Sequence, residues 1–424
     1  MAGALDGIRI LEFSEIIAAP FAGMLLSDLG ADVIKVEPPT GEAWRISAQF
    51  MPGESRQFIS LNRGKRGLSV NLKEPEGREV IYKIVPDMDV VIINYRPDTP
   101  GNLGIDYETL SAINPRLVYI ENTAFGRKGP SSHRPGYDLV VQAMTGLMAA
   151  DGKTSETGVP QAINPAVADF ATGITIAWGV CAGLFARERT GKGQKIESIL
   201  MATALAMQTG SFMELDAIDA AFTGEFAERV RQARAAGASW DELQKIRKEM
   251  RPLFGAFNAY YRCYITRDSV IAVGCLSEAL RRKAAAAMGI SDPRFDDPNM
   301  PAQGPEARAI VGKVVQEAEA RMREKTTDEW LAIFDAAGVP AGPFKSVEEL
   351  RDDPQVVAND LMVDLEHSLV GHLRMVGPIL TMSETPTAVK SASPALGEHN
   401  EEILAGLGYA AAHIADLRAR GIIG

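Results

Sequence analysis

Cysteine, histidine and blocks of like charge are scarce in this sequence of 424 residues. Its three cysteines, Cys181, Cys263 and Cys275, have no metal-ligand spacing, so we predict no metal site and expect reduced, buried thiols in a cytoplasmic protein. The net charge is -11, and no run of lysine and arginine offsets it. This argues against nucleic acid as a main partner, because phosphate binding needs clustered basic residues.

Long hydrophobic runs are scarce as well. The one long run, residues 170–187, is slightly short for a bilayer span and rich in Gly, Ala and Thr, which favours a buried core helix and no membrane partner. The opening MAGALDGIRILEF has no basic region, long apolar run or cleavage site, so no export signal is expected. The composition is that of a globular protein, and the length predicts two domains or one large domain with an insertion.

The first part of the chain alternates between strand-like and helix-like segments. The strand-like segments are residues 8–13, 32–37, 89–94 and 116–121, and the helix-like ones are residues 20–31 and EGREVIYKIV. Such alternation predicts an α/β fold with a parallel sheet flanked by helices.

Ligands bind to such sheets at the carboxyl ends of the strands, which here are the loops that begin at Ser14, Glu37 and Asn94. None of these loops carries G-x-G-x-x-G or the P-loop pattern. The common dinucleotide and nucleoside-triphosphate sites are therefore not predicted.

The middle of the chain has a different character. Residues 210–253 are charged and rich in helix formers, which predicts solvated helices. The stretch YYRCYITRDSVIAVGC predicts a hairpin with its turn at Arg267 and Asp268. Helices are expected from there to about residue 337, followed by a second alternating stretch.

One carboxylate, Asp169, stands at the head of an apolar helix of small residues in INPAVADFATG. Helix position alone favours an N-cap, because Asp is a preferred N-cap residue. The alternative is a reactive carboxylate. Free amides at the helix start would keep it ionised and would stabilise the oxyanions that form when it attacks a substrate. Gly173, one turn later, would let the helix approach another backbone or a ligand closely.

Seven ordered motifs over nearly the whole chain resemble the class III CoA-transferases, a family that includes formyl-CoA and carnitine CoA-transferases and, as a close branch, alpha-methylacyl-CoA racemase. These motifs are LDGIRILEFSEIIAAPFAGMLLSDLGADVIKVEPPTGEAWR, NRGKRGLSVNLKEPEG, NYRPDTPGNLGIDYETLSAINPRLVY, GYDLVVQAMTGLM, ADFATG with GKGQ, AGVPAGPFKSVEELRDDPQV and LGEHNEEILAGLGY.

The resemblance implies a doubly wound parallel-sheet large domain that the C-terminal segment completes, a smaller α+β domain and an interlocked homodimer. The expected division is a CoA-binding Rossmann-like domain, a helical linker, a small domain and a return segment, at residues 1–205, 206–253, 254–337 and 338–424.

The resemblance also implies covalent catalysis by Asp169. Its carboxylate attacks the thioester of an acyl-CoA to give a mixed anhydride, CoA attacks that anhydride to give an aspartyl-CoA thioester, and the acceptor acid reverses the sequence. The partners are then an acyl-CoA and a small carboxylic acid. CoA serves as a substrate, and no permanently bound cofactor or metal is expected.

The racemase branch needs an acid and a base that flank the alpha-carbon of the acyl group. Racemases of this family supply a His just before an Asp, in the motif that reads Gly136-Tyr137-Asp138 here. Tyr137 therefore favours the transferase, and the racemase is the alternative. We predict that Tyr137 donates a hydrogen bond to the thioester or to Asp169, with a packing role as the competing interpretation.

The CoA site is predicted from the matching family positions, which are Ala18, Leu72, Lys73, Asn94, Tyr95, Arg96, Asn102 and Leu103, with Arg45 near the ligand. Arg96 is expected to contact a phosphate or the ribose, because it ends a parallel strand. Two departures stand out: Pro38 replaces an Arg of many transferases, and Ile17 replaces a Gln of formyl-CoA transferase. The apolar Ile17 argues against formate and oxalate as the preferred pair of acids.

Formyl-CoA transferase also has a run of glycines that forms a mobile lid, whereas the matching RPLFGAFNAYYRCY has one glycine, Gly255. We hypothesise that the charged insert and FGAFNAYY close the pocket instead. They would favour a small branched or dicarboxylic acyl group, and an intramolecular transfer within a mesaconyl-CoA-like diacid is compatible with this.

Overall fold

The computed structural model describes residues 2–250, 258–297 and 304–424, which form two compact units. The larger unit joins the chain up to Glu214 to Pro354–Gly424, and the smaller unit is Leu215–Asp353. These limits differ from the predicted ones, because the charged helices of the expected linker and residues 338–353 both group with the smaller unit. Gly255 and half of the FGAFNAYY stretch, residues 254–257, lie outside the described residues.

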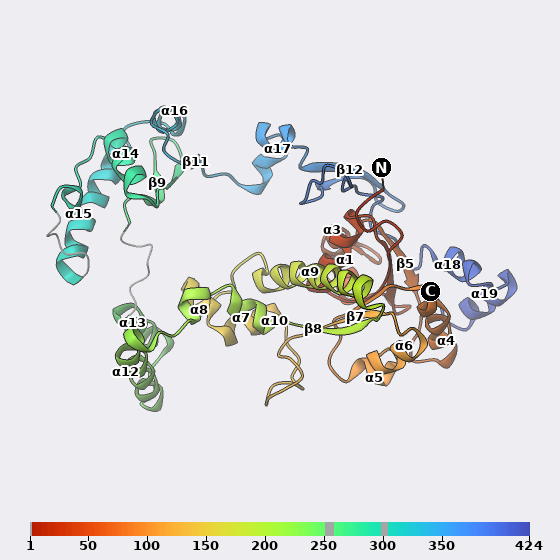
Figure 1. Ribbon diagram of the computed structural model, residues 1–424. Helices are drawn as coiled ribbons and strands as arrows, with labels where there is room; N and C mark the ends of the chain where they lie inside the picture. Colours follow the sequence, from red (N-terminus) through yellow and green to blue (C-terminus); the bar gives the residue numbers. More distant parts are fainter. Residues whose placement is uncertain (1, 251–257, 298–303) are drawn as a thin grey trace. The chain divides into compact units, whose positions relative to one another are not determined.

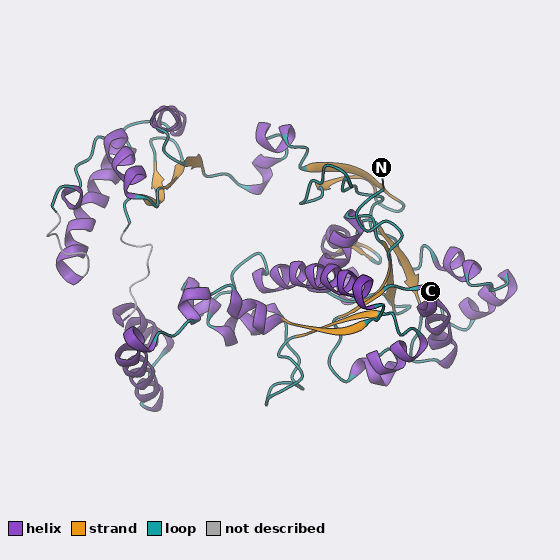
Figure 2. Cartoon of the chain, viewed as in Figure 1, coloured by secondary structure: helices purple, strands orange, loops and turns teal. Residues whose placement is uncertain are grey.

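The larger unit is built on a six-stranded parallel sheet, drawn in orange in Figure 2. Its order is β5 (Lys65–Ser69), β2 (Asp32–Glu37), β1 (Arg9–Phe13), β6 (Val90–Ile93), β7 (Val118–Thr123) and β8 (Gln194–Ile199). Every neighbouring pair is parallel. The predicted α/β fold with a large parallel sheet is thereby confirmed.

Helices cover both faces of this sheet (Figure 1). Successive residues of β1 enter different cores, since Ile10 packs on one face and Leu11 on the other. The Ile10 face is covered by α1 (Ala18–Asp28) and α9 (Val167–Thr190). The Leu11 face is covered by α4 (Pro75–Ile84), α6 (Tyr107–Ile113), α18 (Asn400–Gly406) and α19 (Ala411–Ala419).

The strand order places a crevice between β1 and β6. From β1 the chain proceeds outward to β2 and β5, whereas from β6 it proceeds the other way to β7 and β8. The loops that leave the carboxyl ends of β1 and β6 therefore diverge, and this topological switch point is where open α/β sheets bind ligands.

The C-terminal segment lies against the β5 edge of the sheet. The Asn400 side chain accepts a hydrogen bond from Ser69 N at 2.8 Å, and its amide donates to Gly424 O at 2.9 Å. Val70 forms a bridge with Ile423, and Asn71 N donates to Ile422 O at 2.7 Å. Residues from the two ends of the larger unit thus build one edge of the sheet together.

Among the described residues α9 is the one helix that is long and apolar enough to cross a membrane, but half of its apolar window is buried. A Cβ atom on Gly173 would lie 2.7 Å from Ala18 O, so glycine permits the close approach of α1 that was expected at this position. The opposite side of α9 exposes Trp178 (72%) and Phe185 (66%). The expectation of a buried core helix therefore holds for one face of α9 only.

The smaller unit holds a three-stranded antiparallel sheet of β9 (Tyr261–Ile265), β10 (Val270–Gly274) and β11 (Ala341–Pro343). The predicted hairpin is confirmed, since Ile265 pairs with Val270 around Arg267 and Asp268. The helices of this unit are α12 (Asp216–Ala235), α13 (Trp240–Met250), α14 (Glu278–Met288), α15 (Gly304–Met322) and α16 (Thr327–Ala337). Cys263 on β9 is exposed, so the expectation of a buried thiol is wrong there.

Short elements complete the larger unit. They are α2 (Ala43–Ile46), β3 (Gln49–Met51), β4 (Glu54–Ser55), α3 (Arg56–Leu61), α5 (Thr99–Leu103), α7 (Asp138–Thr145), α8 (Leu147–Asp151), α10 (Leu200–Ala206), α11 (Thr209–Phe212), α17 (Pro354–Ala358), β12 (Met362–His367) and β13 (Gly371–Val376).

Candidate active site

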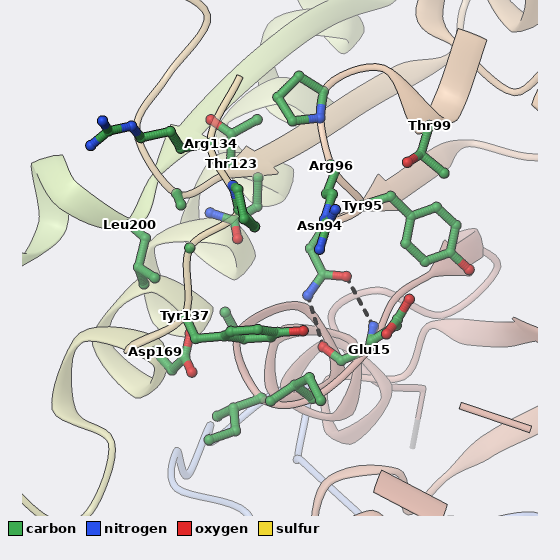
Figure 3. Close-up of a pocket in the computed structure, with 18 residues that line it drawn as sticks. Glu15, Asn94, Tyr95, Arg96, Thr99, Thr123, Arg134, Tyr137, Asp169 and Leu200 are labelled. Carbon is green, nitrogen blue, oxygen red and sulfur yellow. Dashed lines mark hydrogen bonds between the residues drawn. The ribbon is translucent and has the colours of Figure 1, made fainter. Parts of the chain in front are cut away.

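A cavity of about 300 Å³ lies at the switch point between β1 and β6. Figure 3 shows the residues that line it, which come from the loops after β1, β6 and β7 and from the starts of α9 and α10. The cavity brings together the predicted residues Ala18, Asn94, Tyr95, Arg96, Tyr137 and Asp169. Residues from five different parts of the sequence therefore meet at one point.

Asp169 is the third residue of α9 and not its N-cap. The N-cap is Ala166, which has no side-chain capping bond. The N-cap interpretation of Asp169 is therefore wrong. Its side chain, only 8% exposed, belongs to the cavity wall, and Leu200 and Tyr137 are its labelled neighbours in Figure 3.

The amides at the start of α9 are occupied by another carboxylate. Asp138, the first residue of α7, accepts hydrogen bonds through Oδ1 from Ala168 N at 3.0 Å and Asp169 N at 3.2 Å. Burial, followed by the charge of Asp138, raises the pKa of Asp169 to about 7. The expectation that free helix amides hold Asp169 ionised is therefore wrong, because Asp138 takes up two of them and adds a like charge.

Asp138 is itself fixed from two sides. Gln142, one turn further along α7, donates to Asp138 Oδ2. The same Gln142 amide accepts from Ile163 N at 2.9 Å and donates to Ile163 O at 3.1 Å, which ties down the loop before α9. Sequence reasoning missed Asp138 as a functional residue, although it follows directly after Tyr137.

The loops after β1 and β6 are joined by Asn94. Its side chain accepts from Glu15 N at 2.9 Å and donates to Glu15 O at 2.8 Å, as the dashed lines in Figure 3 show. Asn94 lines the cavity as predicted, but both ends of its amide are engaged with the protein. Its side chain therefore fixes the loop that leads into α1.

A second cavity of about 240 Å³ adjoins the first, and both are lined by Glu15, Tyr95 and Thr99. Three more predicted residues, Leu72, Lys73 and Leu103, line this second cavity. The two adjacent cavities therefore have Asp169 in the lining of one and Lys73 in the lining of the other.

Two predicted ligand contacts lie elsewhere. Arg45 is fully buried, and its guanidinium donates to Glu37 at 2.7 and 2.9 Å, to Glu54 at 3.0 Å and to Pro394 O at 2.8 Å. It also stacks on Phe58, with 3.5 Å between the guanidinium carbon and the ring centre. Arg45 lines neither cavity, and its donors are used inside the fold. Asn102 on α5 is exposed and lines neither cavity.

Several cavity residues were absent from the sequence-based prediction, namely Glu15, Ile16, Asn122, Thr123, Arg134 and Leu200. Asn122 and Thr123 end β7, and Leu200 follows β8 directly. Strand β8 carries Lys195 and Glu197 at the edge of the sheet and escapes prediction because it is not an apolar run. Within the described residues, no group of three or more His, Cys, Asp or Glu side chains could hold a metal ion.

Known proteins resemble this chain in sequence and in fold. The family described as CoA-transferase family III matches residues 5–400 of the chain. The chain belongs to CoA-transferase family III. As an enzyme of this family, it is a CoA-transferase that acts on CoA thioesters, and the racemase alternative is not favoured.

Relatives match this CoA-transferase over nearly its full length. Succinyl-CoA:glutarate CoA-transferase of Mus musculus is 31% identical over 406 residues, which cover 94% of this chain and 85% of the relative. Formyl-CoA:oxalate CoA-transferase of Streptomyces coelicolor is 31% identical over 429 residues, which cover both chains completely. The crystal structure of a CAIB/BAIF family protein from Brucella suis has a TM-score of 0.73 and 30% identity, covering 96% of this chain and 100% of that one.

The like charge of Asp138 leads to a testable pH dependence of this CoA-transferase. If Asp169 reacts as the carboxylate, kcat/KM should rise with pH through an apparent pKa near 7. Asp138→Asn keeps an oxygen that accepts from the start of α9 but removes the charge, so the rise should move to lower pH. The measurement is the pH profile of kcat/KM for both proteins. Coincident profiles would show that the charge of Asp138 does not act on the reacting group.

Proposed function

We propose that this CoA-transferase moves CoA between carboxylic acids through covalent intermediates on Asp169. One observation carries the proposal: a buried carboxylate with a raised pKa lies in the wall of the switch-point cavity, which shares the lining residues Glu15, Tyr95 and Thr99 with a second cavity. A carboxylate of raised basicity is a better nucleophile than an ordinary aspartate.

The reaction follows from the chemistry of a single carboxylate. An Asp169 oxygen attacks the thioester carbon, the C–S bond breaks, and CoA leaves as the thiolate from a mixed anhydride. The thiolate then attacks Cγ of Asp169, which releases the first acid and forms an aspartyl-CoA thioester. The acceptor carboxylate repeats the two steps in reverse, so that the new acyl-CoA forms and the Asp169 carboxylate returns.

The start of α1 provides groups for the oxyanions of these steps. Ile17 is the N-cap of α1 without a side-chain cap, and Ala18 lies in the cavity against Gly173 of α9. Amides at a helix start favour negative charge, so we assign oxyanion stabilisation to this segment. In Figure 3 the Tyr137 hydroxyl points away from Asp169, which favours its proposed hydrogen bond to the thioester over one to Asp169.

We place CoA along both cavities, with its nucleotide end at Leu72, Lys73 and Leu103 and its acyl group at Asp169. Arg96 and Arg134 line the first cavity, and Arg96 interacts electrostatically with Glu15 in the same wall. The carboxylates of a dicarboxylic acid would pair with these two guanidinium groups, in line with the acids named for the Mus musculus relative. We therefore propose small branched or dicarboxylic acyl groups as substrates, transferred between two molecules or within one diacid.

We further propose a cytoplasmic homodimer. The exposed apolar side of α9, with Ile174 at 51%, Trp178 and Phe185, supports a partner surface, because exposed apolar patches of this kind mark interaction sites. The second copy would cover the helix that carries Asp169.

Chemical trapping tests the proposed mechanism. The protein is incubated with succinyl-CoA, glutaryl-CoA and branched diacid-CoAs and then treated with hydroxylamine, and the modified residue is located by peptide mass spectrometry. We expect a hydroxamate at Asp169 that is absent in Asp169→Asn and retained in Asp364→Asn, a change at an exposed carboxylate of the β12–β13 hairpin. An unmodified Asp169, together with exchange of substrate alpha-protons in deuterated water, would replace the transferase mechanism by racemisation.

A further inference from the structure

Ile16 has a left-handed backbone conformation, with φ of 68°. This region is costly for a β-branched residue, because its Cβ substituents crowd the backbone, whereas glycine adopts it freely. Ala48, Thr209 and Asp360 are the other described non-glycine residues with positive φ, but Ile16 is the one that lines the first cavity. The unfavourable conformation therefore occurs at the site itself.

The surroundings of Ile16 force this conformation on it. Ile16 N donates to Glu42 Oε2 at 3.0 Å, and Lys35 Nζ donates to Ser14 O at 2.9 Å. Glu15, between these two residues, is held by both hydrogen bonds of Asn94. Strained residues persist where independent contacts fix the backbone around them, and such positions cluster at ligand-binding sites.

The backbone alone does not explain why this position carries isoleucine. The turn needs a left-handed residue, and glycine would meet that need without strain. Ile16 is half-buried and lines the first cavity, next in sequence to Glu15, which lines both cavities, and to Ile17, which lines the first. An isoleucine at a position whose backbone favours glycine therefore points to a contact that needs its side chain.

We propose that Ile16 is a substrate-binding residue whose side chain packs against the thiol end of the pantetheine arm of acyl-CoA. This inference rests on the proposed function, which places the arm along the path from the second cavity to Asp169. The methylene groups next to the sulfur are the apolar end of the pantetheine arm. An aliphatic side chain can pack against them and forms no hydrogen bonds with the amide groups of the arm. The turn at Ser14–Ile16, which its backbone hydrogen bonds hold in place, then sets the position of the thioester relative to Asp169.

Ile16→Gly tests the proposal through binding, in an Asp169→Asn background that cannot turn over. Isothermal titration with succinyl-CoA should give a Kd about tenfold higher than in Asp169→Asn alone, since an apolar contact is lost. Binding of adenosine 3′,5′-bisphosphate, which has the nucleotide end but no pantetheine arm, should not change. Relief of strain offsets the lost burial, so the melting temperature should stay within about 2 °C of the parent.

Ala48→Gly is the matched control, because Ala48 is an exposed left-handed residue that lines neither cavity. It should leave both Kd values unchanged. Ile16→Asn decides the case if the glycine variant does not fold, since Asn tolerates the conformation and should weaken succinyl-CoA in the same way. An unchanged Kd for succinyl-CoA in the folded variant would overturn the role of Ile16. Failure of the proposed function would show separately, as absence of CoA transfer by the protein with Asp169 intact.

Discussion

Asp169→Asn should lower kcat for CoA transfer by at least about a thousandfold, the order of loss found when an enzyme loses its covalent nucleophile. Asparagine keeps the shape of the side chain but has no carboxylate to form an anhydride. The measurement is steady-state transfer from succinyl-CoA to glutarate. Activity within tenfold of the parent would contradict covalent catalysis by Asp169.

A loss of stability would not explain this result, because the raised pKa of Asp169 fixes the direction in which its ionisation changes the stability of the fold. Its folded-state pKa of about 7 lies above the ordinary value of 3.8, so the folded protein binds this proton more tightly than the unfolded chain. Its contribution to stability is present below pH 4 and is lost as pH rises towards 7. At pH 8 the ionised carboxylate costs stability, so Asp169→Asn should unfold at the same temperature as the parent or higher. A melting temperature clearly below that of the parent at pH 8 would contradict this sign.

Lys65→Met should lower the free energy of unfolding by about 3 kcal/mol, the lower end of the loss expected when one partner of a buried ion pair is removed, because Lys35 still pairs with Glu12 at 3.5 Å. The Lys65 ammonium is buried and donates to Glu12 Oε1, Pro20 O and Asn62 Oδ1, each at 2.8 Å. Burial lowers its pKa to about 8, so at pH 7 it is charged and pairs with the fully buried Glu12. Methionine fills the space but leaves three acceptors without this donor. Urea unfolding at pH 7 measures the change.

Glu324→Gln is the control for this experiment. Its carboxylate pairs with Arg321 at 3.3 Å, and both side chains are about half exposed. A pair of this kind contributes about 0–1 kcal/mol, so the urea midpoint should hardly move. If Lys65→Met lowered the free energy of unfolding as little as Glu324→Gln does, the network around Lys65 would not stabilise the larger unit.

The sheet was open to prediction because its inner strands are short segments dominated by aliphatic residues, although β1, β2 and β7 also carry buried polar residues such as Glu12, Lys35 and Glu121. Strands β1, β2, β6 and β7 are buried on both faces by helices, and such strands show in a sequence without any knowledge of their neighbours. The alternation with helices predicts parallel strands whose carboxyl ends share one edge of the sheet, where Asn94 and Ala18 lie, but the strand order that makes the switch point comes from the structure. Asp169 was predicted as a site residue from the family resemblance, because its position near the start of a helix would by itself indicate an ordinary capping role.

The polar partners of the site were not open to prediction, because they depend on contacts between distant segments. Arg45 was assigned to the ligand from its motif, but its partner Pro394 lies near the other end of the chain. Asp138 takes the helix amides that were expected to serve Asp169, and no local pattern links residues 138 and 168. Hydrogen-bond partners of this kind are set by tertiary packing, which residue type and spacing do not encode.

The discontinuous larger unit has a consequence for how the protein is made. A ribosome delivers the whole smaller unit, Leu215–Asp353, before it delivers Pro354–Gly424. Because domains fold as units once their sequence is available, the smaller unit can complete its core while the β5 edge still lacks α18, α19 and the contact of Asn71 with Ile422. Asn71 lines the second cavity, so this part of the candidate site should be among the last parts of a newly made chain to reach its final form.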